Sequence, residues 1–293
     1  MKNFHPLLIF SFLVFLLTSV QAQGNEHEDA VIRIKGSDTL SKVLKEWTRT
    51  YQEHNPKVRI ELSGGGSSNG IAALINSHIE LAASSRLLRP HEIHLVIKKS
   101  GVRPVSHEVA RDAISVVVHP SNPLNAVSLQ HLMEIYGKHK GEPLWSDLGV
   151  NVPGCQDQKI LSLSRKNNSG TYLFFRQAIL DKNDHFNSQI VSMDGSASVV
   201  SMVSQTPCAI GYAGMAYITG AVKTLCISRS HNLNTPCVPP TVATTLDKSY
   251  PLARALYLYS LGPPKGEVLN FLEWIRGPVG KEILVRNGYV SPP

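Results

Sequence analysis

Three short segments repeat one design, in which an apolar stretch runs into a turn of small and hydroxyl residues and then into a helix-forming stretch. The turns are Gly36–Leu40 (Gly-Ser-Asp-Thr-Leu), Ser63–Gly70 (Ser-Gly-Gly-Gly-Ser-Ser-Asn-Gly) and Arg165–Thr171 (Arg-Lys-Asn-Asn-Ser-Gly-Thr). A strand that passes through a tight turn into a helix is the repeating unit of α/β folds. The repeated design therefore limits the chain to an α/β architecture and gives several helix starts the same polar chemistry.

Strand and helix signals alternate along the rest of the chain. Val31–Ile34 and Val58–Leu62 are typical of strands, and Leu40–Gln52 places its apolar residues on one helical face. Further strands are expected at 113–118, 160–163, 209–212, 222–227 and 255–259. Further helices are expected at 69–77, 128–135, 172–179, 196–204 and 266–276. The length of 293 residues suffices for one large domain or for two lobes with cores of their own.

Helix starts of this kind favour anions. The first backbone N–H groups of a helix lack intrahelical partners and lie at the positive end of the helix dipole. Serine and threonine hydroxyls add donors without bulk, and Arg165, four residues before Ser169, can add a planar guanidinium that binds an oxyanion through two hydrogen bonds. Taken singly, each turn is more often an ordinary N-cap or glycine turn. Three turns converging on one point would make a cage for a tetrahedral oxyanion.

The start of the chain indicates export. Residues 1–22 are expected to be a cleaved signal peptide, because Lys2 precedes an apolar run and the segment ends in Val20-Gln21-Ala22. The run from Leu7 to Leu17 is about eleven residues, against roughly twenty for a membrane-spanning helix. No cysteine follows the run, so nothing indicates a lipoprotein anchor. We therefore expect a soluble protein of the periplasm or another extracytoplasmic space. The net charge of +7 is dispersed, which suits an anionic ligand and gives no indication of nucleic-acid binding.

The chain contains four cysteines, and an extracytoplasmic compartment permits disulfides. Four cysteines allow three pairings that sequence alone cannot choose between. Cys226 and Cys237 would close a short, polar, turn-rich loop, so we favour this pair, with Cys155 and Cys208 as the second bridge. The cysteine spacing fits no zinc site, and neither a metal nor a cofactor is expected.

The order of the motifs resembles the phosphate-binding subunits of ABC importers. The resemblance rests on five motifs in a fixed order. The first two turns come first, Ala83-Ser-Ser-Arg86 follows, then the third turn with Phe174-Phe175 after it, and finally Ala209-Ile-Gly-Tyr212. It runs from about Val31 to the carboxyl end, and Arg-x-x-x-Ser-Gly-Thr is its most specific element. The family is not one of enzymes, and membership implies inorganic phosphate as ligand, the transmembrane subunits of an ABC importer as partner, and a monomeric state.

The resemblance also implies a fold and a set of site residues. The fold would be a two-lobed, type II Venus flytrap with two crossing hinge strands, near Arg111–Val117 and Tyr250–Tyr259. Lobe I would comprise residues 29–112 and 255–293, and lobe II residues 113–254. The phosphate-binding residues matched to the family motifs are Thr39, Leu40, Ser67, Ser85, Arg165, Ser169, Gly170 and Thr171.

Two positions depart from the family pattern. Ser85, followed by Arg86, stands where many relatives carry an acidic residue that accepts the proton of phosphate, and Asn167 stands where an Asp often offsets the arginine. Both changes are expected to make the cleft more positive. Asp38 is the nearest carboxylate in a matched turn, and it is either the missing acceptor or only the cap of the following helix.

Other interpretations are weaker. The ligand could be sulfate, molybdate or tungstate, or the protein could have kept the fold for sensing or adhesion. Gly66–Gly70 fits the G-x-S-x-G pattern of serine hydrolases with Ser68 as nucleophile. The only candidate partners are Asp194 or Asp247 as the acid and His231 as the base. Asp247 comes after the histidine in the chain, and His231 lies in a polar loop without a motif. His91 and His94 could form a metal pair on a helix, although two solvent-facing histidines are the more ordinary interpretation.

Overall fold

The computed structural model describes Met1 and residues 30–138, 141–182, 184–230 and 236–293. The expected signal peptide and His231 lie outside the described residues. Within them, no helix is both long and apolar enough to cross a membrane.

One nine-stranded sheet of mixed strand direction runs through both halves of the molecule, in the order β2-β1-β3-β11-β4-β8-β6-β7, with β9 also pairing with β4. A two-stranded sheet of β5 and β10 lies apart from it. The strands are β1 (Ala30–Gly36), β2 (Val58–Ser63), β3 (Leu81–Ser84), β4 (Pro104–Val118), β5 (Ala126–Ser128), β6 (Leu161–Arg165), β7 (Val191–Met193), β8 (Ala209–Gly214), β9 (Lys223–Thr224), β10 (Cys226–Ser228) and β11 (Ala253–Leu261).

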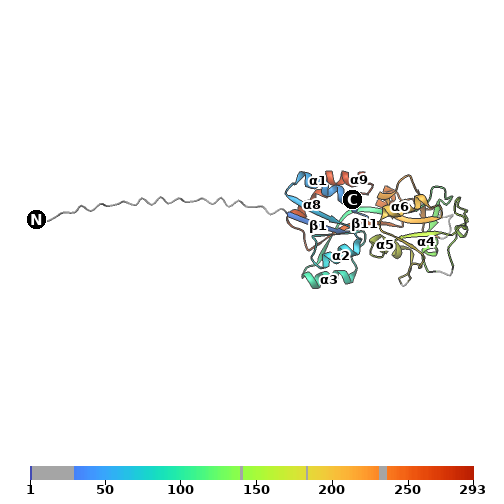
Figure 1. Ribbon diagram of the computed structural model, residues 1–293, viewed down its shortest axis with the longest axis horizontal. Helices are drawn as coiled ribbons and strands as arrows, with labels where there is room; N and C mark the ends of the chain where they lie inside the picture. The colour runs from blue at the N-terminus through green and yellow to red at the C-terminus, as the bar shows by residue number, and fades with distance from the viewer. Residues whose placement is uncertain (2–29, 139–140, 183, 231–235) are drawn as a thin grey trace.

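Helices cover both faces of the large sheet, and the molecule divides into two lobes (Figure 1). In the lobe that contains β1, helices α1 (Ser41–His54), α8 (Gly266–Arg276) and α9 (Pro278–Arg286) cover one face, and α2 (Ser67–Ile75) and α3 (Pro90–Ser100) cover the other. In the other lobe, α4 (Leu129–Tyr136) and α5 (Gly170–Ile179) lie opposite α6 (Ser196–Gln205). The short helices are η1 (Trp145–Leu148), η2 (Met215–Tyr217) and α7 (Val242–Leu246).

The cores follow the same division. Buried residues under α1, α8 and α9 form one cluster around Trp47 and Phe271, and a smaller cluster lies under α2 and α3. The other lobe has a large cluster around Tyr136, Phe175 and Tyr212 and a smaller one beneath α6. Ala216 of η2 is an exception, because it comes from the second lobe's stretch of chain yet packs in the first lobe's core. Each lobe therefore buries apolar surface of its own, the dominant stabilising term in folding.

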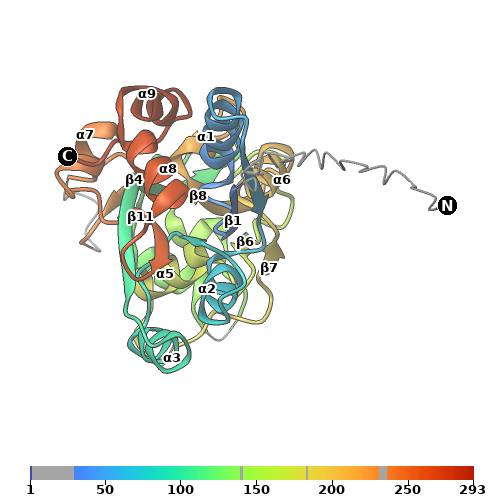
Figure 2. The same ribbon diagram turned by 90° about the vertical axis from the view of Figure 1, so that its left-hand side faces the viewer.

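Two strands pass between the lobes. β4 pairs with β11 along residues 104–113 and then with β8 along residues 114–118, so it changes partners where it leaves one lobe for the other. β11 lies antiparallel to β4, with a register shift between Leu256 and Tyr257, and also pairs with β3. Seen from the end of the molecule, β4 and β11 run side by side between the two helical layers (Figure 2).

Both expected disulfides are confirmed. Cys155 is bonded to Cys208 and Cys226 to Cys237, with Cα–Cα distances of 5.0 and 5.5 Å. The expected strand over 222–227 is wrong as a single element. It divides into β9, which pairs with β4, and β10, which pairs with β5 in the separate sheet.

Candidate functional site

The first turn is held against β3 by a glycine that no other residue can replace. Gly36 ends β1 with a φ of 138°, and a Cβ there would lie 2.2 Å from the carbonyl oxygen of Ala83. Ser37 then donates its backbone N–H to the same carbonyl oxygen at 2.9 Å. This close approach brings Thr39 and Leu40, both buried, to the carboxyl edge of the sheet. The Leu40 N–H donates to the Ser37 carbonyl oxygen at 3.2 Å, so it closes the turn.

The second turn places two serine hydroxyls beside each other. Gly66, with a φ of 87°, is the N-cap of α2, and Ser67 is the first residue of that helix. The Ser67 Oγ accepts the backbone N–H of Ser85 at 3.1 Å and lies 3.3 Å from the Ser85 Oγ. Both serines are almost fully buried, so β3 and α2 bring the second turn and the Ala-Ser-Ser-Arg segment to one point.

The third turn comes from the other lobe. Ser169 is the N-cap of α5, and its Oγ accepts the N–H groups of Thr171 and Tyr172 at 3.2 and 3.4 Å. The Ser169 hydroxyl proton is therefore free for donation elsewhere. A Cβ on Gly170 would lie 2.4 Å from the Ser67 Oγ and 2.6 Å from the Ser85 Oγ, which shows how tightly the α5 start fits against the first lobe.

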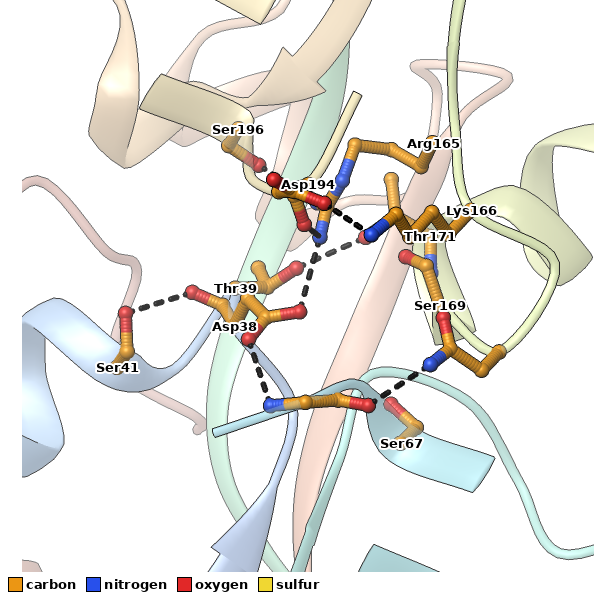
Figure 3. A network of polar contacts seen from close by, with 12 residues as sticks. Asp38, Thr39, Ser41, Ser67, Arg165, Lys166, Ser169, Thr171, Asp194 and Ser196 are labelled. Carbon is orange, nitrogen blue, oxygen red and sulfur yellow. Dashed lines mark hydrogen bonds and ion pairs between the residues drawn. The ribbon is translucent and has the colours of Figure 1, made fainter. Parts of the chain in front are cut away.

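The three turns meet between the lobes (Figure 3). The Thr39 and Thr171 hydroxyl oxygens lie 2.8 Å apart. Asn168 makes two further bonds across the lobes: its Nδ2 donates to the Gly65 carbonyl oxygen at 3.0 Å, and its own carbonyl oxygen accepts the Ser68 N–H at 3.1 Å. The convergence expected for the matched residues is thus present in the fold, and their role in binding stays a prediction.

Arg165 is a buried cation at this meeting point. Its side chain is 1% exposed, its Nη2 donates to Asp38 and to the Asp194 carbonyl oxygen at 3.0 and 2.9 Å, and its Nη1 donates to the Ser196 Oγ at 3.2 Å (Figure 3). Burial lowers the pKa of Arg165, and the Asp38 carboxylate opposes this shift. Among the described residues, the Arg165 Nε and the Ser37 Oγ are buried polar atoms without a hydrogen-bond partner. Such atoms are costly unless something else pairs with them.

Asp38 does not cap the following helix. The N-cap of α1 is Leu40, and no side chain caps that helix. The carboxylate instead accepts the Gly65 N–H at 3.1 Å through Oδ1 and pairs with Arg165 through Oδ2. The cap interpretation is therefore wrong. The expectation of a more positive cleft also needs correction, because the Asp38 carboxylate offsets the charge of Arg165 although Asn167 cannot.

Two ionised residues of the site were not identified from the sequence. Asp112 on β4 and Arg254 on β11 face each other in the strand register and form a buried ion pair of 2.8 Å. Arg254 also reaches the hydroxyls of Thr171 and Thr39 at 3.0 and 3.4 Å. Burial raises the pKa of Asp112, and the Arg254 guanidinium opposes that shift. The available signal was a charged residue in each hinge segment: Asp112 follows Arg111 at the start of Arg111–Val117, and Arg254 is the one charge within Tyr250–Tyr259.

These groups together suit a small, multiply charged oxyanion. The site combines hydroxyl donors, the amino ends of α2 and α5, and a guanidinium with an unpartnered N–H. Two arginines are balanced by two aspartates, so an anion would not face the full charge of either arginine. Donors of this kind, aimed at one point and shielded from water, recognise oxyanions strongly.

The alternative sites find little support in the geometry. Ser68 is the second residue of α2, and its hydroxyl accepts from Arg86 at 3.3 Å rather than from a histidine. Asp194 is exposed and ion-paired with Lys166. His91 and His94 both lie exposed on α3. The triplet Cys155, Asp157 and Cys208 has metal-like spacing, but both of its cysteines are in a disulfide.

A two-lobed α/β fold crossed by two strands, with a buried polar site between the lobes, is the architecture of a solute-binding protein. A family model described as a PBP superfamily domain matches residues 21–278. The phosphate-binding protein PstS of Pseudomonas aeruginosa is 32% identical over 269 residues, which cover 88% of this chain and 82% of the relative. PstS of Borreliella burgdorferi is 26% identical, with 97% of each chain covered.

Solved structures agree with the sequence relatives. A protein from Clostridium perfringens, assigned as a phosphate ABC transporter substrate-binding protein and solved with bound phosphate, is 25% identical with a TM-score of 0.76, and the match covers 90% of this chain and all of that one. An ABC-type phosphate transport receptor from Vibrio cholerae shares the fold at a TM-score of 0.69 and 22% identity, over 89% of this chain and 100% of the receptor. The chain therefore belongs to the PBP superfamily and, within it, to the family of the phosphate-binding protein PstS.

Proposed function

We propose that this chain is an exported solute-binding protein that captures inorganic phosphate between its lobes and delivers it to an ABC importer. The observation that carries the proposal is the buried Arg165, whose unpartnered Nε lies among the hydroxyl-rich helix starts of both lobes. A desolvated guanidinium with an unused donor is stable in such a place when an anion completes its hydrogen bonds. The names of the relatives support phosphate as that anion.

The proposed ligand contacts follow from the donors in the site. Arg165 would supply charge. The hydroxyls of Thr39, Ser67, Ser85, Ser169 and Thr171 would donate hydrogen bonds, and the backbone at Leu40 and Gly170 would complete the cage. Asp38 would accept the proton that phosphate keeps near neutral pH. Asp38 pairs with Arg165 at 3.0 Å, and this pairing supports a position of the carboxylate beside the ligand.

The mechanism would be closure of two lobes around the ligand. We place lobe I at residues 29–112 and 255–293 and lobe II at 113–254. The change of partner in β4 between residues 113 and 114 supports the first boundary. The contacts of Asn168 with Gly65 and Ser68 would form only when the lobes approach. Phosphate would thus be bound by closing and released by opening, without a covalent step.

The test is calorimetric titration of purified, ligand-stripped protein with phosphate, sulfate and molybdate. We expect one phosphate per chain and weaker binding of the other two anions. Tighter binding of sulfate or molybdate would assign the site to another oxyanion, and failure to bind all three would overturn the proposal. An esterase assay on the same sample should give no turnover, because Ser68 has arginine rather than histidine as its partner.

The cellular setting is part of the same proposal. Export through the signal peptide would place a monomer outside the cytoplasm, where its disulfides are stable. Fractionation of cells that express the full chain should recover the protein without residues 1–22. Recovery of the uncleaved chain in the cytoplasm would contradict this part of the proposal and leave phosphate binding intact.

A further inference from the structure

Arg254 occupies a position that no other charged residue of the site shares, because it contacts hydroxyls of both lobes from a strand that joins them. Its Nη2 lies 3.0 Å from the Thr171 Oγ1 and 3.4 Å from the Thr39 Oγ1. Thr39 lies in the first turn and Thr171 in the third. Arg254 itself is on β11 and is 6% exposed.

Asp112 fixes the direction of this guanidinium. Its Oδ2 accepts from the Arg254 Nε at 3.1 Å and from the Nη2 at 2.8 Å, while its Oδ1 accepts the Met215 N–H at 3.0 Å. The Arg254 Nη1 donates to the Ser85 carbonyl oxygen at 3.2 Å. The guanidinium is therefore held through all three of its nitrogens by two groups, the Asp112 carboxylate and the Ser85 carbonyl oxygen, that do not move with either threonine side chain.

The count of protons then determines what the threonines can do. Nη2 carries two protons, of which one goes to Asp112 and the other is shared by the two threonine oxygens, 2.8 Å apart. Both oxygens thus act as acceptors toward Arg254. One hydroxyl proton lies in the bond between the threonines, and the other is left to donate outward. Without Arg254, either hydroxyl could rotate and present a lone pair instead.

We propose that Arg254, held by Asp112, is a positioning residue of the oxyanion site, which orients the Thr39–Thr171 hydroxyl pair so that its remaining proton is donated toward the ligand, and which links the two lobes' halves of the cage. The inference rests on the proposed function, because it assumes that an oxyanion occupies the site. Arg254 acts through the two threonines and need not touch the ligand. A planar guanidinium is required, since lysine carries one point of charge and cannot reach Asp112 and both hydroxyls in the same way.

The test is a double-mutant cycle on phosphate affinity, measured by calorimetry with the full exported chain. The variants are Arg254→Lys, Thr171→Val and the double variant. Arg254→Lys should weaken phosphate binding by about tenfold or more while keeping the charge opposite Asp112. If Arg254 acts through Thr171, the double variant should lose clearly less affinity than the product of the two single losses.

A matched control is Arg86→Lys, another buried arginine in an ion pair, whose side chain and that of its partner Glu92 are 5% and 8% exposed. Combined with Thr171→Val, it should give the product of the single losses. Circular dichroism and urea unfolding identify any variant that fails to fold, and Arg254→Gln replaces Arg254→Lys in that case.

The outcomes separate the two proposals. If the wild-type chain binds no oxyanion, the proposed function fails first. If the wild-type chain binds phosphate and the Arg254 cycle is multiplicative, or Arg254→Lys binds within about threefold of wild type, the positioning role is wrong and the function stands.

Discussion

At the scale of single residues, we expect phosphate binding to depend most on the charge of Arg165. Replacement by alanine removes a buried cation and leaves Asp38 without its partner. We expect Arg165→Ala to weaken phosphate binding by about 3 kcal/mol or more, the scale for truncating one partner of a buried charge pair. Calorimetry measures this directly, with the exposed Arg49→Ala as control. A loss below about tenfold would place Arg165 outside the site.

We expect Asp38 to determine whether phosphate is distinguished from sulfate. Phosphate keeps a proton near neutral pH and sulfate does not, so a buried acceptor favours phosphate. We expect Asp38→Asn to narrow the ratio of phosphate to sulfate affinity by about tenfold or more, the scale of one mismatched buried polar contact. The substitution also removes the negative charge beside Arg165, which favours both anions, so the ratio of the two affinities is more informative than either affinity alone.

The measurement for Asp38 is the pair of affinities in wild type and variant. An unchanged ratio would transfer the acceptor role to Ser85, whose hydroxyl can accept as well as donate. Ser85→Ala is then the decisive second variant, because its Oγ lies only 3.3 Å from Ser67 in the same cage.

At the scale of elements, the start of α5 controls how closely the lobes approach. A Cβ at Gly170 would lie 2.4 Å from the Ser67 Oγ and 2.6 Å from the Ser85 Oγ, both in the opposite lobe. We therefore expect Gly170→Ala to leave the free energy of unfolding nearly unchanged but to weaken phosphate binding by roughly a hundredfold. Gly220→Ala is the control, since a Cβ there meets no atom within 4 Å. Equal affinities for the two variants would refute the tight approach.

The hinge strands carry a pH-sensitive group. The His107 Nε2 donates to the Ser260 Oγ at 2.9 Å, between β4 and β11, because the Ser260 hydroxyl is itself used to donate to the Gly262 carbonyl oxygen. Burial, with a smaller contribution from the charge of Arg276, lowers the pKa of His107 to about 4. The unfolded chain, with a histidine pKa of about 6.5, binds the proton first.

Stability should therefore fall as the pH falls from about 6.5 toward about 4, and His107 should contribute up to about 3 kcal/mol to that loss. Above pH 6.5 the histidine is neutral in both states and contributes no slope. Urea unfolding at pH 7 and pH 5 of wild type and His107→Gln measures the effect. The variant should show a flatter dependence, and an equal slope in both proteins would show that other groups cause the acid loss.

Most elements near the site could be predicted because their local patterns are strong. The strand and helix on either side of each turn agree with β1, α1, β2, α2, β6 and α5. The amino-terminal half of β4 was missed because it has no clear apolar pattern. Polar and charged residues from Arg103 to Asp112 surround only a few apolar ones, and this part of the strand is held by its pairing with β11. β3, with four residues, is too short to show a period, and α9 follows α8 after a single glycine.

The candidate site divides in the same way. Residues inside the motifs were found because glycine and hydroxyl turns are local signals. Asp112 and Arg254 were missed because they lie 142 positions apart in the sequence, and they pair only through the register of β4 against β11. The role of Asp38 was ambiguous, since an Asp before a helix is usually a cap, and only the position of Arg165 in the other lobe decides otherwise.

At the scale of the whole molecule, ligand binding should stabilise both lobes together. Phosphate contacts would come from both lobes, so a ligand that binds only the native form raises the free energy of unfolding of the whole unit. We expect about 2.7 kcal/mol of stabilisation at a phosphate concentration one hundred times Kd. Urea unfolding with and without phosphate measures it, with chloride at equal ionic strength as control. Stabilisation of one lobe alone would contradict a shared site.

The path of the chain through the large sheet sets an order of folding. β11 lies between β3 and β4 in the centre of the sheet, although it comes last of all the strands. The lobe that contains β1 cannot complete its sheet until residues 253–261 are available, whereas the core of the other lobe is drawn from residues 113–252. A chain that emerges from a membrane pore amino end first would thus finish its second lobe before its first. During that interval the edges of β3 and β4 that later pair with β11 have no partner for their hydrogen bonds. These two strand edges are where a chaperone outside the cytoplasm would be needed most.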